Sequence, residues 1–223
     1  LTDRVTEFRT KYSTSLFLTA GESGGYVREG KPQYALYSYD YAGLDPENGD
    51  PLGYLDGRVS NDWRSIIQRS TIEDLRYHGS ARPTMFGSFR NTLRWRNITL
   101  SSNISYRMGY YFRRSSVNYA ALWLGLIVHG DYEKRWKQPG DEQFTSVPSI
   151  PNSLNAIRNQ FYMNSAALVE KGDHIRLQDV QLSYTLKKVK FGNFELENGQ
   201  IYVYANNLGI IWKATKTHLD PDY

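Results

Sequence analysis

Two neighbouring segments, residues 84–95 and 98–112, alternate between apolar and polar side chains almost without interruption. An alternation with period two places all the apolar side chains of a strand on one face. From Ile98 to Phe112 every second residue is apolar or aromatic, with one serine as the exception. A run of about fifteen residues is roughly twice the usual strand length. The pattern therefore predicts a long strand with two chemically different faces.

When a two-residue turn is placed at Arg96-Asn97, the apolar side chains of the two segments fall on the same face. The apolar face then pairs Trp95 with Ile98, Leu93 with Leu100, Phe89 with Ile104 and Met85 with Met108. The polar face pairs Arg94 with Thr99, Thr92 with Ser101 and Arg90 with Asn103. Cross-strand pairing requires this agreement of face and register. We therefore expect an antiparallel hairpin.

Other parts of the chain also read as strands. We expect them at residues 34–41, 175–186 and 201–211, and Leu16 and Leu18 suggest a further strand within residues 1–20. In the segment 175–186 the apolar residues change phase, which indicates a bulge near Asp179. Long alternating strands are thus a recurring feature of the chain.

The connections between these strands differ strongly in length. A short helix is predicted within residues 63–75, with Asn61 or Asp62 as its cap. Residues 113–172 form a long connection that contains a strand or short helix at 119–128, and residues 187–199 read as a polar connector. Transmembrane barrels have this asymmetry of short turns and long loops. A soluble β-sandwich also alternates, and it remains an alternative.

Composition excludes several classes of protein. The chain has no cysteine, so disulfide scaffolds and thiolate chemistry are excluded. Lys and Arg (27) nearly balance Asp and Glu (23), so no nucleic-acid-binding stripe is expected. The longest apolar run has about ten residues, too short for a membrane-spanning helix. Barrel strands are shorter and alternating, so composition leaves a β-barrel open.

Five motifs, in order, resemble one family. These are YAGLDPENGDPLGY (41–54), RPTMFGSFRNTLRWRNITLSSNISY (82–106), RWKQPGDEQFTSVP (135–148), GDHIRLQDVQLSYTL (172–186) and the Asn-Leu ending of Tyr204-Ala205-Asn206-Asn207-Leu208. Together they resemble the SusC/RagA-type TonB-linked outer-membrane proteins (TonB-dependent receptors). The resemblance spans about residues 30 to 212. Each motif is weak alone, but the five in sequence are specific.

The resemblance implies an all-β fold, an antiparallel transmembrane barrel of the 22-stranded type with long extracellular loops. Such proteins import glycans or peptides across the outer membrane of Gram-negative cells. A SusD-like surface lipoprotein caps the barrel, and TonB supplies energy through the N-terminal region. On this basis we expect contacts with the lipid bilayer and with an oligosaccharide or peptide substrate, no cofactor, no nucleic acid and no enzymatic activity.

Residues 1–223 are accordingly expected to be a C-terminal part of the barrel, without the plug domain and without the final strand. The turn at Arg96-Asn97 and residues 187–199 should be periplasmic. The connection 113–172 and the tail from Lys213 should be extracellular. A TonB-dependent siderophore or vitamin receptor and a soluble β-rich binding or adhesin module remain alternatives.

Arginines gather on the predicted polar face. Arg90, Arg94 and Arg107 share it, and Arg113 continues the same phase. If this face lines the lumen, the arginines either form salt bridges with an acidic plug or attract an anionic substrate. Both interpretations stay open at this point.

Predicted loops carry Trp63, Tyr132 and Trp136. Exposed aromatic rings can stack on sugars, but they can equally anchor a loop or contact the capping lipoprotein.

Asp45, Asn48 and Asp50 cluster oxygen atoms around Gly49, as calcium loops do, without the full spacing of such loops. A plain turn is the simpler interpretation. The four histidines are scattered, without the spacing of metal ligands, and are expected at the surface or in loops. The G-x-S-x-G match at residues 21–25 is not followed by the helix that a catalytic nucleophile requires.

Overall fold

The structure is a computed structural model that describes residues 4–7, 13–24, 26–126, 129–192 and 194–222. The chain divides into two compact units. Residues 83–110 and 171–223 form one, called here the sheet unit. Residues 1–82 and 111–170 form the other, called here the mixed unit. Each is described by itself.

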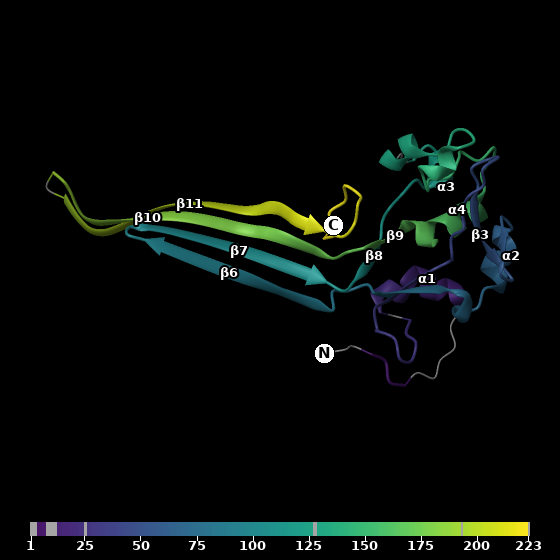
Figure 1. Ribbon diagram of the computed structural model, residues 1–223, viewed down its shortest axis with the longest axis horizontal. Helices are drawn as coiled ribbons and strands as arrows, with labels where there is room; N and C mark the ends of the chain where they lie inside the picture. Colours follow the sequence, from purple (N-terminus) through teal and green to yellow (C-terminus); the bar gives the residue numbers. More distant parts are fainter. Residues whose placement is uncertain (1–3, 8–12, 25, 127–128, 193, 223) are drawn as a thin grey trace. The chain divides into compact units, whose positions relative to one another are not determined.

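The sheet unit is one antiparallel sheet of four long strands. They are β6 (Met85–Trp95), β7 (Ile98–Met108), β10 (His174–Phe191) and β11 (Phe194–Lys213). Their order across the sheet is β11-β10-β7-β6, and Figure 1 shows the four strands lying side by side. Within the described part of the chain, β6 and β11 are the two edges of this sheet.

The hairpin of β6 and β7 has the predicted register. Met85 pairs with Met108, Phe89 with Ile104, Leu93 with Leu100 and Trp95 with Ile98. Arg96 takes a φ of +53° in the turn. Asn97 is held by β10, because its Nδ2 donates to the carbonyl of Thr185 at 2.8 Å. The predicted pairing is therefore confirmed.

The prediction that the second strand continues to Phe112 is wrong, because β7 ends at Met108. Gly109 takes a φ of +76°, which lies outside the β region and interrupts regular strand geometry. The Asp173 carboxylate accepts the N–H of Gly109 at 2.7 Å. Tyr110 is then buried at 5% exposure rather than facing outward. With eleven residues each, β6 and β7 have the length of a membrane-spanning β-strand.

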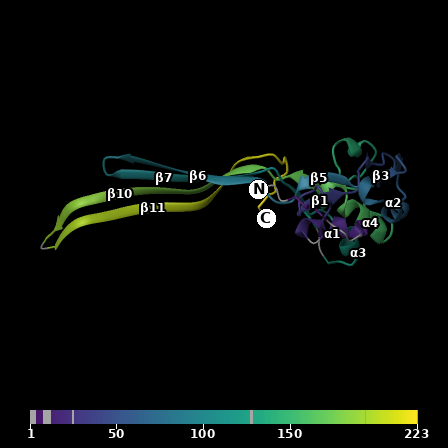
Figure 2. The same cartoon turned by 90° about the horizontal axis from the view of Figure 1, so that it is seen from below.

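The predicted polar connector at residues 187–199 is also wrong, because it is part of a hairpin. Lys187 pairs with Asn198, and Lys190 pairs with Glu195. Pairing of β10 with β7 stops at Tyr184, so the hairpin of β10 and β11 continues past the turn of β6 and β7 (Figure 2). Pairing between the two strands holds these residues in an extended conformation although most of their side chains are polar.

The bulge near Asp179 is confirmed. The register shifts between Leu177 and Asp179 against both neighbouring strands. Gln178 is the extra residue relative to β7, and its Nε2 donates to Oγ of Ser105 at 2.7 Å.

The mixed unit combines short strands with short helices. Its strands are β1 (Ala35–Ser38), β2 (Gly43–Leu44), β3 (Pro51–Leu55), β4 (Arg58–Ser60), β5 (Arg76–Ser80), β8 (Tyr111–Arg113) and β9 (Val169–Lys171). Its α-helices are α1 (Thr14–Ala20), α2 (Trp63–Arg69), α3 (Tyr119–Trp123) and α4 (Ala156–Met163). Short 3-10 turns are η1 (Gly21–Ser23), η2 (Ile72–Asp74), η3 (Gly130–Lys134), η4 (Asp141–Gln143) and η5 (Ala166–Leu168).

Strand pairs organise this unit. β1 pairs with β5, β3 pairs with β2 and β4, and β8 pairs with β9. The predicted strand at residues 34–41 is thus shorter than expected. Over both units, strands make up most of the regular structure, which confirms the all-β prediction at this coarse level. Among the described residues, no helix combines the length and the apolar character needed to cross a membrane.

The predicted strand within residues 1–20 is wrong, because residues 14–20 form α1. Residues 1–3 and 8–12 of that segment lie outside the described residues. Phe17 and Leu18 are adjacent and both 3% exposed in a core shared with Tyr37, Tyr39 and Phe161. Two consecutive side chains cannot enter one core from one face of a strand, whereas adjacent positions of a helix can.

The predicted helix within residues 63–75 is confirmed as α2. Asp62 is its cap, since Oδ1 of Asp62 accepts the N–H of Ser65 at 3.0 Å. The segment 119–128 adopts the helical alternative as α3, with residues 127–128 outside the described residues.

Candidate functional site

The apolar face of the sheet unit is uncovered. Phe89 is 62% exposed, Leu93 64% and Val203 69%. One polar pair, Asn91 with Ser102, interrupts the face. Soluble monomers rarely expose contiguous apolar surface of this extent. The face is therefore suited to an apolar environment.

Aromatic side chains mark both ends of this face. Trp95 and Tyr184 lie level near the turn, since both pair with Ile98. Tyr106 and Trp212 lie level at the other end, since both pair with the same residue of β10. The two levels are about 26 Å apart along the strand, at 3.3 Å per residue. Transmembrane barrels carry an outward apolar band about 25 Å tall between two aromatic girdles.

The polar face holds Arg90 as predicted. Its Nη2 lies 3.0 Å from Oδ2 of Asp179, and Nδ2 of Asn103 donates to the same oxygen at 3.1 Å. The Asp179 side chain is buried, whereas the Arg90 side chain is half-exposed. A carboxylate at the bulge thus links β10 to β7 and β6.

Arg94 lines a polar hollow of about 350 Å³ near the turn, together with Arg96 and Lys187. Its other lining residues are neutral: Asn97, Thr99, Ser101, Gln181, Ser183, Thr185 and Gln200. Over the described part of the chain, neither Arg94 nor Lys187 has an acidic partner within ion-pair distance. The hollow is therefore a positive site on the polar face that internal acids do not neutralise.

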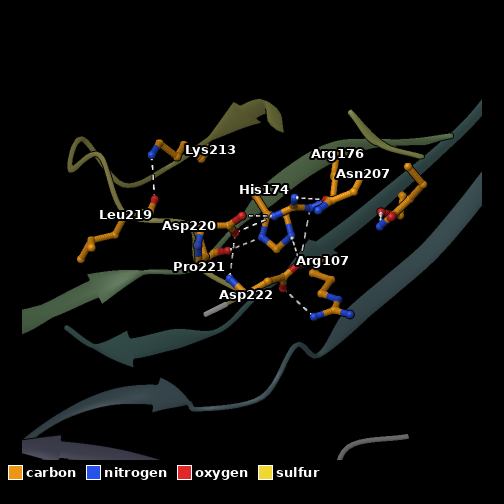
Figure 3. Close-up of polar contacts among 12 residues, drawn as sticks. Arg107, His174, Arg176, Asn207, Lys213, Leu219, Asp220, Pro221 and Asp222 are labelled. Atoms are coloured by element: carbon orange, nitrogen blue, oxygen red, sulfur yellow. Dashed lines mark hydrogen bonds and ion pairs between the residues drawn. The ribbon is translucent and has the colours of Figure 1, made fainter. Parts of the chain in front are cut away.

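Carboxylates of the C-terminal tail meet the cations at the other end of the sheet (Figure 3). Nη2 of Arg176 lies 2.5 Å from both carboxylate oxygens of Asp220. Asp222 lies 2.5 Å from Nη1 of Arg107 and 3.3 Å from Nε2 of His174. We call the segment 215–222 with these contacts the tail latch. His174 was expected at the surface, but it is 1% exposed.

Backbone contacts complete the tail latch. Nζ of Lys213 donates to the carbonyl of Leu219 at 2.7 Å, and the Tyr110 hydroxyl donates to that of Pro221 at 3.4 Å. Burial, the largest single influence, raises the pKa of the Asp220 carboxyl, but the hydrogen bonds from Arg176 and from the Asp222 backbone, together with the charges of Arg176 and His174, hold this pKa below its usual range.

Arg113 does not lie on the polar face of the sheet. It belongs to β8 in the mixed unit, where its Nε lies 3.0 Å from Oε1 of Glu22 and its Nη2 donates to the Tyr37 carbonyl at 2.6 Å. The phase argument that grouped it with the other arginines fails because the chain turns at Gly109.

Trp63 and Trp136 line one hollow of the mixed unit, with a volume of about 660 Å³. Asp50 and Arg158 line it too. Nε of Arg158 lies 2.6 Å from Oδ1 of Asp50, and the Arg158 side chain is only 3% exposed. The fold thereby brings Asp50, Trp63 and Trp136, which the sequence suggested separately, to one hollow.

Both tryptophans are packed in place. Trp136 is 8% exposed, its Nε1 lies 3.3 Å from Oε2 of Glu142, and its ring covers Gly49. Nε1 of Trp63 donates to the Pro51 carbonyl at 2.7 Å. These contacts indicate that the two tryptophans anchor loops and do not present free rings on which sugars could stack.

Tyr132 lies outside this hollow. It packs against a small buried cluster formed by Val117, Tyr119 and Val147. The guanidinium of Arg135 lies 4.0 Å from the centre of its ring. This environment likewise favours an anchoring role.

The oxygen atoms considered for metal binding are used within the turn. Oδ1 of Asp45 accepts the N–H of Glu47 at 2.9 Å, and Oδ1 of Asn48 accepts that of Asp50 at 2.8 Å. Asp50 is engaged by Arg158. Wherever the structure describes the chain, no group of three His, Asp or Glu residues could hold a metal ion. The geometry favours the plain turn.

The sequence pattern does not identify Arg158, Arg176, Asp220 or Asp222 as functional residues. The two acids around Pro221 offered a weak signal, but their partners lie on strands 44 residues or more away. Nothing in the local pattern identifies Arg158 as buried.

No protein-family model matches the chain. The chain is 27% identical over 158 residues to the TonB-dependent receptor P26 of Formosa agariphila, an alignment that covers 65% of this chain. The chain spans only 14% of that receptor's length.

The fold is similar to part of a chain in structures of the RagAB peptide transporter. In one structure the TM-score is 0.59 at 21% identity, covering 84% of this chain and 20% of the other. In the open-open state of the RagAB peptide importer, the TM-score is 0.62 at 18% identity, covering 94% and 22%. Sequence and fold together confirm the predicted resemblance to SusC/RagA-type TonB-dependent receptors.

Proposed function

We propose that the chain is a C-terminal part of the outer-membrane barrel of a TonB-dependent importer of the SusC/RagA type. One observation carries this proposal. The sheet unit has an uncovered apolar face bounded at each end by aromatic residues, and a polar face opposite. Strands of eleven residues suit a tilted membrane span. The relatives support outer-membrane import in general.

In this proposal the apolar face contacts lipid and the polar face lines the lumen of a large barrel of the 22-stranded type. Lipid-facing barrels have no open edge, so further strands of the same receptor pair with β6 and β11. The turn at Arg96-Asn97 and the end of the β10–β11 hairpin are periplasmic. The mixed unit and the tail latch are extracellular.

The imported substrate is an oligosaccharide or a peptide too large for porins. A SusD-like surface lipoprotein is the proposed extracellular partner, and TonB acts through an N-terminal region. Two of the lumen arginines, Arg90 and Arg107, are neutralised by Asp179 and Asp222, which supports a structural role for them. Arg94 is not neutralised, so it remains the candidate for attracting an acidic plug segment or an anionic substrate.

Cysteine labelling tests the assignment of the two faces. The chain contains no cysteine, so single cysteines can be placed in a full-length receptor whose other cysteines, if any, are replaced. Leu93→Cys reports the apolar face, and the neighbouring Thr92→Cys is its matched control on the polar face. Phe89→Cys and Arg90→Cys form a second pair.

In native outer membranes, a water-soluble maleimide should react with the two polar-face cysteines and leave the two apolar-face cysteines unlabelled. Detergent-denatured protein should label at all four positions. Equal labelling of all four in native membranes would contradict a lipid-facing surface and favour a soluble β-rich module.

A further inference from the structure

The 660 Å³ hollow of the mixed unit has the size of a site for a small ligand. Its floor contains Arg158, whose buried guanidinium is only partly used. Nε binds Asp50, and Nη2 donates to the carbonyl and hydroxyl oxygens of Ser149 at 2.9 and 3.2 Å. Nη1 has no hydrogen-bond partner among the residues that the structure describes. One charged donor group is therefore left at the floor.

Two further cations line the hollow. Arg135 is held in place, because its Nη1 donates to the Tyr132 carbonyl at 2.8 Å. Lys137 is exposed, and its ammonium has no acidic partner in the described ranges of the chain. Among all the lining residues only Asp50 is acidic, and Arg158 neutralises it.

The carboxylates of Asp141 and Glu142 follow the hollow's lining residues in the sequence and accept hydrogen bonds from N–H groups. Oδ2 of Asp141 accepts the backbone N–H groups of Lys137 and Gln138 at 2.9 and 3.1 Å. Oε2 of Glu142 accepts from Gly140 and Trp136. Neither carboxylate lines the hollow, so Arg135 and Lys137 contribute two positive charges beside the neutral pair of Arg158 and Asp50.

The neutral lining groups also offer mainly donors. Oδ1 of Asn48 accepts the N–H of Asp50, and Oδ1 of Asn155 accepts that of Arg158 at 2.9 Å. Each amide keeps its NH₂ group available, since an amide oxygen that is bonded inward leaves the two donors of Nδ2. A hollow with positive charge and spare donors matches an ionised carboxylate, which only accepts hydrogen bonds.

We propose that this hollow binds a ligand through a carboxylate group, with Arg158 at the floor and Arg135 and Lys137 beside it. The carboxylate belongs either to a uronic acid or to the C-terminus of a short peptide. The proposal concerns the mixed unit alone and does not depend on where the sheet unit resides.

Calorimetric titration of the full-length protein in detergent tests the proposal. The probes are glucuronate, with glucose as its uncharged counterpart, and glycylglycine, with glycylglycinamide as its counterpart. At least one carboxylate probe should bind saturably, and its counterpart without the carboxylate should not. Binding of glucuronate alone or of glycylglycine alone would identify the source of the carboxylate.

The variant Arg135→Gln/Lys137→Gln should weaken binding by about tenfold or more, as expected for losing charge-assisted hydrogen bonds. Lys216→Gln removes an exposed lysine of the sheet unit and should leave affinity unchanged. Because Lys137 is exposed and without an acidic partner, the single variant Lys137→Gln should keep the melting temperature and still weaken binding. Absence of binding by both carboxylates, equal binding of the counterparts that lack the carboxylate, or unchanged affinity in the Arg135 and Lys137 variants would overturn the proposal.

Discussion

Nε of Arg158 on α4 lies 2.6 Å from Oδ1 of Asp50, 108 residues away in the sequence. Arg158 is 3% exposed and Asp50 24%. The pair joins the turn that precedes β3 to α4, a helix within the long connection of residues 113–172. A buried charge that loses its partner is strongly destabilising.

Asp50→Asn should therefore lower the unfolding free energy of the mixed unit by about 3 kcal/mol. Thermal unfolding followed by tryptophan fluorescence is the measurement, since Trp63 and Trp136 lie at the same hollow. Arg69→Gln is the control, because its ion pair with Asp56 is exposed on both sides and should contribute less than about 1 kcal/mol. Equal losses in both variants would contradict the role of burial.

Gly49 should not tolerate a side chain. Its φ is +72°, and an added Cβ would lie 2.4 Å from Cδ2 of the buried Trp136 ring. Gly57 has a similar φ of +77° but no atom within 4 Å of that position. Gly57→Ala should cost about 1 kcal/mol from backbone strain alone. Gly49→Ala should lower the melting temperature clearly further, and equal shifts would exclude the contact with Trp136 as the cause.

The tail latch should protect its own segment from proteolysis. Asp220→Asn removes one charge from the pair with Arg176, whose side chain is 7% exposed. Trypsin cleavage after Lys216 should then be about tenfold faster, since the equilibrium population of the opened segment controls cleavage. Adding Lys216→Gln to this variant should abolish the new cleavage. An unchanged digestion rate in Asp220→Asn would argue that the backbone contacts hold the tail alone.

The two faces of β6 should differ in their tolerance of charge. Phe89→Arg places a guanidinium on the apolar face, and a charge at the centre of a lipid-facing band costs about 2–4 kcal/mol. Ser88→Arg, on the polar face, is the matched control. We expect a loss of heat-modifiable, folded receptor in outer membranes for the first variant only. Equal folding yields would count against contact with lipid.

His78 should make stability depend on pH. Burial is the main cause that lowers its pKa to about 4, and the charges of Arg76 and Arg113 add to this. Since the unfolded state binds the proton near pH 6.5, stability is complete above that pH and falls as pH decreases from about 6.5 to about 4. The loss should be about 1–2 kcal/mol after solvent screening.

His78→Gln should flatten this dependence relative to the unsubstituted protein. Thermal unfolding midpoints between pH 4 and 7.5 measure the difference. Glutamine retains an amide that can form a hydrogen bond with Ser38, whose Oγ lies 2.7 Å from Nε2 of His78. Parallel pH curves for the two proteins would assign the dependence to other groups.

Local patterns in the sequence determined the pairing of β6 and β7 and the bulge near Asp179, and they limited the cap of α2 to Asn61 or Asp62. Each rests on a period or a spacing of a few residues. In the hairpin, two strands agree on one register, and a slip by one residue would exchange the faces of a strand. The same alternation placed Arg90 on the polar face.

Only the tertiary structure decided the end of β7, the helical state of α1 and the extension of the β10–β11 hairpin. Gly109 ends β7 because Asp173, 64 residues away, accepts its N–H. Asp50 and Arg158 meet, and Asp222 reaches Arg107, through folding of distant segments. Long-range contacts of this kind leave no periodic signal, because their partners are brought together by packing and charge pairing rather than by position along the chain.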